Sequence, residues 1–236
     1  MKKRIQIFLL IAIAAAGLRA GWIFYQRHEA NREEQAKKQD APAPALNADY
    51  YVTPKKLHAY DLKSARELTK QPVWVKEGYR YTYYPYSAAG HRADLAHEAG
   101  LLLPLQKLDI KDVVLAPAAG QKQVLAVFQQ DGKTFAFPVG RESGGDYNIY
   151  ADEMLFIEDP RGLYKHWPGE IWESIEKHEV KPGMNELQAD FAIGIGTPER
   201  SDDPAIKTVR YPNGGKPLTV TYREGKAIDI KPSSSA

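Results

Sequence analysis

Six histidines are the residues of this sequence best suited to metal binding or acid–base chemistry. They are His28, His58, His91, His97, His166 and His178. A zinc-protease helix needs two histidines at positions i and i+4, so that both rings lie on one face. His91 and His97 are six residues apart and would lie on different faces of a helix, and neither His97 nor His178 has a second histidine at the required spacing. We therefore expect solvated histidines, no metal and no cofactor.

Ser143 has the most suggestive surroundings of any serine, because it lies in the glycine-rich segment Gly140–Gly145. A phosphate-binding loop would contain Gly-Lys-Ser, and the nucleophile elbow of a hydrolase would read Gly-x-Ser-x-Gly. Neither pattern is present, which favours an ordinary loop. A hydrolase stays open on residue types alone, and it would need Ser143 or another hydroxyl within hydrogen-bond reach of a histidine.

Tyrosines gather between residues 79 and 86. Tyr79, Tyr81 and Tyr83 would share one face of a strand, and Tyr86 follows beyond Pro85. Exposed, these rings could bind a glycan or a partner chain, because tyrosine offers a large contact area at low entropic cost. The alternative is that the rings pack in a barrel core and in cross-strand pairs.

The composition excludes several classes of protein. The 236 residues are 43% hydrophobic and 26% charged, which is ordinary for a globular protein. The net charge is only +2, with Lys and Arg interspersed among Asp and Glu, so we expect no nucleic-acid partner. There is no cysteine, which excludes disulfides, thiolate zinc sites, a cysteine nucleophile and a lipidated N-terminal cysteine.

The N-terminal residues 1–25 predict a membrane anchor. Three basic residues precede an apolar run from Ile5 to about Tyr25, roughly the ~20 residues that a bilayer requires. Cleavage of this segment as a secretory signal is the alternative, with small residues at Ala14–Ala16. The anchor predicts a single-pass inner-membrane protein that contacts lipid through this helix and has its C-terminal domain in the periplasm or another extracytoplasmic space.

A charged, Pro- and Ala-rich linker follows at residues 26–49, and a β-rich domain is predicted at residues 50–164. Asp61 is placed to cap a short helix. Short apolar runs then indicate about five strands, and Asp131-Gly132 between two of them is the strongest hairpin signal in the chain. A small antiparallel barrel, SH3-like in size, would close such a set of strands.

Residues 165–232 predict a second module. Pro168 is placed to begin a helix that ends near His178, and Asn185 with Gln188 forms a capping box that opens another. Three strand candidates end the chain. The predicted class is therefore α+β: a transmembrane helix, a small SH3-like barrel, and then two helices packed on a three-stranded antiparallel sheet.

The second module contains a Gly-Met helix start at Gly183 and Met184, and an Ile-Gly-x-Pro turn with Gly196 and Pro198 before its strands. Over about 60 residues this pattern resembles the SmpA/OmlA domain, the BamE-like module of outer-membrane assembly lipoproteins. Asn and Ile stand here where that domain usually has Thr and Leu, and the lipid-carrying cysteine is missing, so lipid anchoring is not implied. The matching residues are Gly183, Met184, Asn185, Gly196 and Pro198.

The resemblance implies a non-enzymatic module that contacts other envelope proteins. Together with the anchor, it predicts a membrane-anchored protein that acts through protein–protein contacts in cell-envelope assembly or maintenance. A cell-wall or glycan-binding module, using Tyr79, Tyr81, Tyr83 and Tyr86, is the alternative function. A hydrolase is the third.

Overall fold

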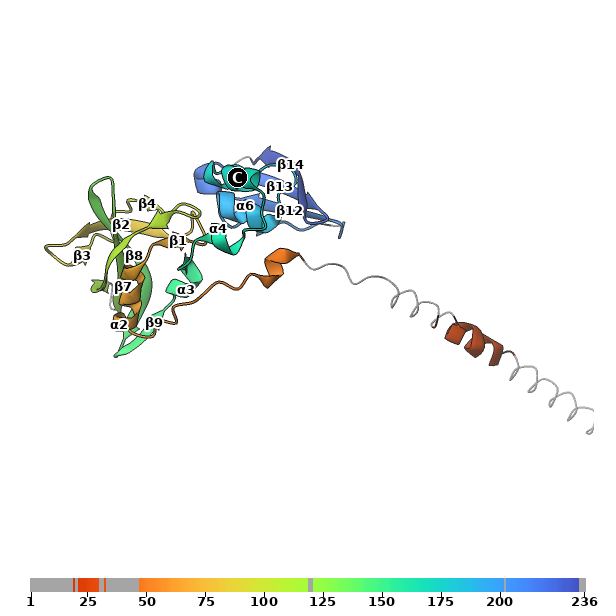
Figure 1. Cartoon of the computed structure of the whole chain (residues 1–236), viewed down its shortest axis with the longest axis horizontal. Coiled ribbons are helices and arrows are strands. Elements are labelled where there is room, and N and C mark those ends of the chain that lie inside the picture. Colours follow the sequence, from red (N-terminus) through yellow and green to blue (C-terminus); the bar gives the residue numbers. More distant parts are fainter. Residues whose placement is uncertain are drawn as a thin grey trace, which may run out of the picture. The chain divides into compact units, whose positions relative to one another are not determined.

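The computed structural model describes Arg19, residues 21–29, Arg32 and residues 47–118, 121–201 and 203–233. The chain divides into two units, residues 1–47 and residues 48–236. Every sheet among the described residues belongs to the second unit (Figure 1). The fold is therefore a property of residues 48–236.

An antiparallel sheet of seven strands forms the first part of this unit. Its main path has the order β3-β2-β8-β7-β6, with β4 paired to β2 and β9 paired to β8. Between β7 and β8, Asp131 and Gly132 have positive φ angles of 51° and 74°, as a tight hairpin turn requires, and the predicted hairpin is confirmed. The strands are β2 (Thr82–Ser87), β3 (Arg92–Ala93), β4 (Gly100–Leu101), β6 (Ile110–Ala118), β7 (Gln121–Gln130), β8 (Lys133–Ser143) and β9 (Asp146–Ile149).

Both faces of this sheet carry buried side chains. Along β7, Val124, Ala126 and Phe128 enter one core, which we call the first core, whereas Leu125 and Val127 enter a smaller core of their own. Successive side chains of a strand point to opposite faces, so a strand covered on both sides is apolar at consecutive positions. This explains why β7 lacks the polar alternation of a half-exposed strand.

A short helical segment before the sheet also packs into the first core. The Asp61 carboxylate accepts a hydrogen bond from the backbone N–H of Ser64 at 2.7 Å, which confirms the predicted helix cap. Ala65 and Leu68 are fully buried. The segment comprises α2 (Leu62–Ala65) and the 3-10 helix η2 (Arg66–Lys70).

A separate sheet of three short strands, in the order β10-β1-β5, joins the first core to a second core in the C-terminal part. Val73 and Val75 of β1 are buried in the first core. Trp74 lies between them and packs against the second core, as does its cross-strand partner Phe156. One strand thus supplies side chains to both cores. The strands are β1 (Val73–Val75), β5 (Lys107–Leu108) and β10 (Leu155–Phe156).

The second core lies between short helices and a four-stranded antiparallel sheet of order β11-β12-β13-β14 (Figure 1). Ile175 and Phe191 from two helices meet Val209 and Val220 from the sheet. Pro198 pairs with Val209 at the sheet edge, where a residue without an N–H is tolerated. The elements are α4 (Pro160–Leu163), α5 (Gly169–Glu176), α6 (Glu186–Ile193), β11 (Thr197–Pro198), β12 (Ile206–Tyr211), the 3-10 turn η3 (Asn213–Gly215), β13 (Leu218–Arg223) and β14 (Lys226–Pro232). The short helix α3 (Ala151–Met154) precedes them, and its buried residues belong to the first core.

The turn into α6 combines a glycine at positive φ with a helix cap. Gly183 has φ 89°, and its N–H donates to the Ala227 carbonyl oxygen at 2.8 Å, which ties the turn to β14. Asn185 and Gln188 form the predicted capping box. The helix ends at Gly194, whereas Gly196 has a different role: a Cβ there would lie 2.4 Å from Cγ1 of Val209.

The predicted α+β class is wrong, because the described chain is mostly β-sheet with a few short helices. The SH3-like barrel is replaced by a seven-stranded sheet and a separate three-stranded one. The C-terminal sheet has four strands rather than three, because Thr197–Pro198 adds an edge strand. Neither α5 nor α6 exceeds eight residues, so the strands provide most of the regular structure.

The predicted transmembrane anchor is also wrong by this structure. Among the described residues, no helix combines the length and the apolar character needed to cross a membrane. Residues 1–18 and 20 of the predicted anchor lie outside the described residues. The predicted single-pass topology and inner-membrane location rested on this anchor, so they are wrong for the same reason.

Replacing Gly183 with alanine should destabilise the fold by about 1 to 2 kcal/mol, because an L side chain at positive φ is strained. A Cβ at Gly183 meets no atom within 4 Å, so the backbone conformation alone is tested. Gly169→Ala is the matched control: its Cβ is equally unobstructed, its φ is ordinary, and we expect it to be neutral or stabilising. Urea denaturation measures both; equal free energies of unfolding would contradict the assigned turn.

Candidate functional site

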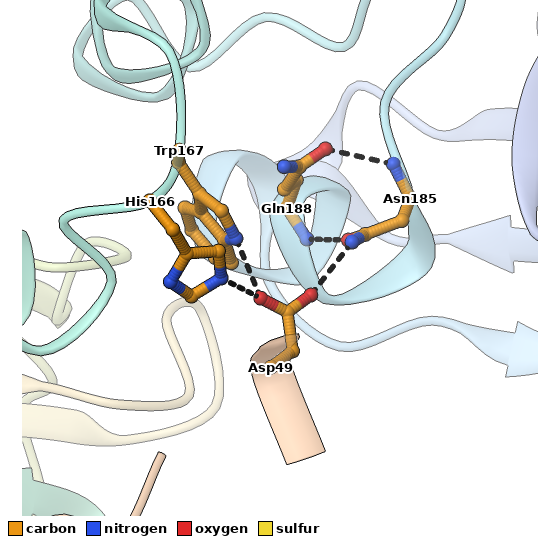
Figure 2. Close-up of polar contacts among 5 residues, drawn as sticks. All are labelled: Asp49, His166, Trp167, Asn185 and Gln188. Atoms are coloured by element: carbon orange, nitrogen blue, oxygen red, sulfur yellow. Dashed lines mark hydrogen bonds and ion pairs between the residues drawn. The ribbon is translucent and has the colours of Figure 1, made fainter. Parts of the chain in front are cut away.

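The carboxylate of Asp49 joins segments that lie far apart in the sequence of the described unit (Figure 2). Its Oδ1 accepts hydrogen bonds from Nε2 of His166 and from Nε1 of Trp167, both at 2.6 Å. Its Oδ2 accepts a hydrogen bond from Nδ2 of Asn185 at 2.8 Å. The Asp49 side chain is only 9% exposed. Three donors from distant parts of the sequence therefore converge on one carboxylate.

Asn185 holds this cluster in place, because its side-chain amide forms hydrogen bonds to both α6 and Asp49. Its Oδ1 accepts the backbone N–H of Gln188 at 2.8 Å and so caps α6, while its Nδ2 donates to Asp49. The Gln188 side chain completes the capping box by accepting the Asn185 N–H at 2.9 Å. Figure 2 shows the 3-10 helix η1 (Ala48–Tyr51) held in this way against the start of α6.

The electrostatics favour the charged form of Asp49. Burial raises the pKa of this carboxyl, but the hydrogen bonds from His166, Trp167 and Asn185 and the charge of His166 outweigh it, so the pKa lies below its usual value. Both oxygens are engaged with protein donors, which favours a structural clamp over a catalytic base. Among the histidines of the described residues, none is hydrogen-bonded to a serine or threonine hydroxyl.

Two further carboxylates hold the chain that follows η1. The backbone N–H groups of Leu57 and His58 donate to the two oxygens of Asp152 at 2.6 and 2.7 Å. The backbone N–H of Lys55 donates to Glu158 at 3.0 Å. We call residues 48–60 the N-terminal strap. The strap is joined to the C-terminal part through its own Asp49, and to α3, which packs into the first core, through Asp152.

A groove of about 300 Å³ lies where the three-stranded sheet meets α4 and α5. One wall carries Trp74, Leu103 and Lys107, and the other carries Arg161 and Trp172. Each tryptophan ring has a cation over it: Nζ of Lys107 is 5.8 Å from the Trp74 ring centre, and Cζ of Arg161 is 5.7 Å from that of Trp172. The remaining lining residues are Pro104, Leu105, Gln106, Asp159, Pro160, Ile175, Glu176 and His178.

The tyrosines predicted as a binding surface do not lie together on one open face. Tyr81 and Tyr83 pack against the first core, and Tyr86 packs against the smaller core. Tyr79 has φ 60° and lies against Gly194 and Gly214. The structure disperses the four rings among different packing environments.

The predicted motif residues surround the start and end of α6. Asn185 belongs to the Asp49 cluster, and Met184 is fully buried in the second core. Ser143 ends β8, in a segment that continues into a turn at Gly144. Asp49 itself was missed, because it lies at the end of the predicted linker and its partners are 117 to 136 residues away in sequence. No local pattern marks such a contact.

A second polar cluster surrounds Asp190 of α6. The half-buried Asp190 carboxyl accepts a hydrogen bond from the Tyr211 hydroxyl, which is 2.8 Å from the hydroxyl of the buried Tyr222. Burial and the nearby charge of Glu186 raise the pKa of Asp190 to about 7, despite the hydrogen bonds from Tyr211 and the Gly196 N–H and the charge of Lys207. Asp190 is therefore a carboxyl that titrates near neutral pH.

Comparison with known protein families, with curated proteins and with solved structures found no match to this chain. The resemblance of the C-terminal part to the SmpA/OmlA domain thus stays a prediction.

Asp49→Asn should lower the free energy of unfolding by roughly 1 to 3 kcal/mol at neutral pH, because an amide cannot accept three hydrogen bonds as the carboxylate does. The folded-state pKa is depressed, so this stabilisation is present above the unfolded pKa and is lost as the pH falls through the folded value. The difference between variant and wild type should therefore shrink in acid. Asp229→Asn removes an exposed ion pair and should change stability by less than about 0.5 kcal/mol.

Asp190 should give the stability a pH dependence opposite in sign to that of Asp49, and Asp190→Asn should remove it. The folded-state pKa is raised, so its contribution is complete below about pH 4 and is lost as the pH rises through about 7. Wild type should lose stability over this range by no more than about 1.4 kcal/mol per pH unit from this group, and the variant should lack that part of the slope. Urea midpoints across the range measure it; parallel profiles would contradict the assignment.

Proposed function

We propose that this protein is a non-enzymatic binding protein that acts through protein–protein contacts, and that the groove between Trp74 and Trp172 is its docking surface. The observation that supports the proposal is the groove itself. Two tryptophans and several aliphatic side chains line a cavity of about 300 Å³, and aromatic residues in such cavities commonly anchor a partner chain.

The backbone at the groove supports the same function. Leu105 lines the groove at φ 50°, a conformation that costs a residue other than glycine about 1 to 3 kcal/mol. Its N–H donates to the Val75 carbonyl oxygen at 3.0 Å, which holds the strained loop against β1. Strained residues gather at ligand sites, where the surrounding structure over-determines them. The loop is therefore pre-formed before any partner binds.

The resemblance to the SmpA/OmlA domain favours protein contacts as well, since it implies a module without catalytic residues. The alternative functions have less support. A glycan-binding surface would need the rings of Tyr79, Tyr81, Tyr83 and Tyr86 on one open face, and their packing separates them. A hydrolase would need a hydroxyl beside a histidine, and the histidine contacts of the described residues include none.

A photo-crosslinking residue, p-benzoylphenylalanine, in place of Leu103 of the full chain should capture a partner chain in the cells that produce the protein. Leu103 is 39% exposed and lines the groove, whereas Leu101 is 40% exposed and lies outside it, so Leu101 is the matched control position. We expect one discrete adduct from position 103 alone, with the crosslinked partner peptide identified by mass spectrometry. Equal crosslinking from both positions, or none from position 103, would count against the groove as the docking surface.

A further inference from the structure

We infer that the groove binds an extended peptide segment in which a bulky apolar side chain lies next to a carboxylate. This inference rests on the proposed function and specifies the chemistry of the partner. The apolar part of the ligand follows from the walls of the groove. Trp74 and Leu105 are only partly buried and Leu103 is 39% exposed, so each has surface that a ligand could cover. A cavity of about 300 Å³ is small, and accommodates one or two side chains rather than a folded element.

The carboxylate follows from the charges at the groove. On the α4–α5 wall, Arg161 is ion-paired with Glu176, and the Asp159 carboxylate caps α4 by accepting the backbone N–H of Arg161 at 2.9 Å. On the opposite wall, Lys107 lies over the Trp74 ring and is exposed. Among the ion pairs of the described residues, none includes Lys107. Lys107 is therefore the groove charge left to pair with a ligand.

The position of Lys107 specifies where that carboxylate should lie. Lys107 and Trp74 are cross-strand partners in the ladder between β5 and β1, so the ammonium and the indole belong to one patch. A side chain stacked on Trp74 brings the adjoining residue of an extended ligand to the ammonium, because successive residues of an extended chain are about 3.3 Å apart along its axis. An uncharged or basic ligand would leave the ammonium without a partner, or repel it.

A random-peptide phage library selected against the full chain tests this inference. We expect the enriched peptides to combine a bulky apolar residue with a neighbouring Asp or Glu. For one labelled peptide from the enriched set, fluorescence anisotropy should show roughly threefold to tenfold weaker binding to Lys107→Glu, since this change replaces an exposed ion pair by repulsion. Lys111→Glu is the matched control, because this exposed lysine lies in β6 outside the groove. The loss should diminish at high salt.

Leu103→Asp separates failure of this inference from failure of the proposed function, with Leu101→Asp as the control for folding. Peptides whose binding is lost in Leu103→Asp but unchanged in Lys107→Glu, or peptides that are basic or uncharged, would overturn the acidic ligand and leave the groove as a docking surface. No enrichment, or enriched peptides indifferent to Leu103→Asp, would overturn both.

Discussion

The pairing of Trp74 with Phe156 across β1 and β10 is the constraint on which the rest of the unit depends. Both side chains pack into the second core, while Val73 and Val75 on the other face of β1 pack into the first. A strand only three residues long can serve two cores because its side chains alternate between faces. The groove exists because this strand brings the loop before β5 to the same place as α4 and α5.

The carboxylate of Asp49 complements this apolar connection with a polar one. A buried charge is tolerated only where hydrogen bonds replace the lost water, and three donors do so here. Two of these donors come from residues 166 and 167 and the third caps α6, so the clamp aligns the strap with the helix that covers the C-terminal sheet. Asp190 lies in the same helix, but burial and the nearby charge of Glu186 outweigh its favourable contacts, so its pKa is raised where that of Asp49 is lowered.

The two tryptophans of the groove have different functions in this arrangement. Trp172 is buried against Trp167 and Arg161 and so helps to form the second core, whereas Trp74 retains surface at the groove. The cation over each ring differs as well. Arg161 forms an ion pair with Glu176, whereas Lys107 forms none with any residue that the structure describes. The groove thus has one wall whose interactions are satisfied within the protein and one wall that is open to a partner.

The sequence by itself determined the local features, because their causes lie within a few residues. The Asp131-Gly132 hairpin, the Asp61 cap, the capping box of Asn185 and the positive φ of Gly183 depend on side-chain geometry and backbone sterics alone. Apolar runs also indicated strands, about five in the β-rich domain and three at the end of the chain. Pairing between strands that are distant in the sequence did not follow, because hydrogen bonds between such strands carry no signal in the sequence of one strand. The order of the seven-stranded sheet and the edge strand at Thr197–Pro198 therefore emerged only in the tertiary structure.

The tertiary structure alone decided the candidate site. Asp49 lies in a segment of linker composition, and nothing near it in the sequence indicates a buried, triply hydrogen-bonded carboxylate. The walls of the groove come from residues as far apart as Trp74 and His178. Conversely, the tyrosines that the strand pattern placed on one face were separated by the irregular backbone at Tyr79 and by two different cores. Contacts between distant segments depend on how the cores pack, and packing is a property of the whole folded chain.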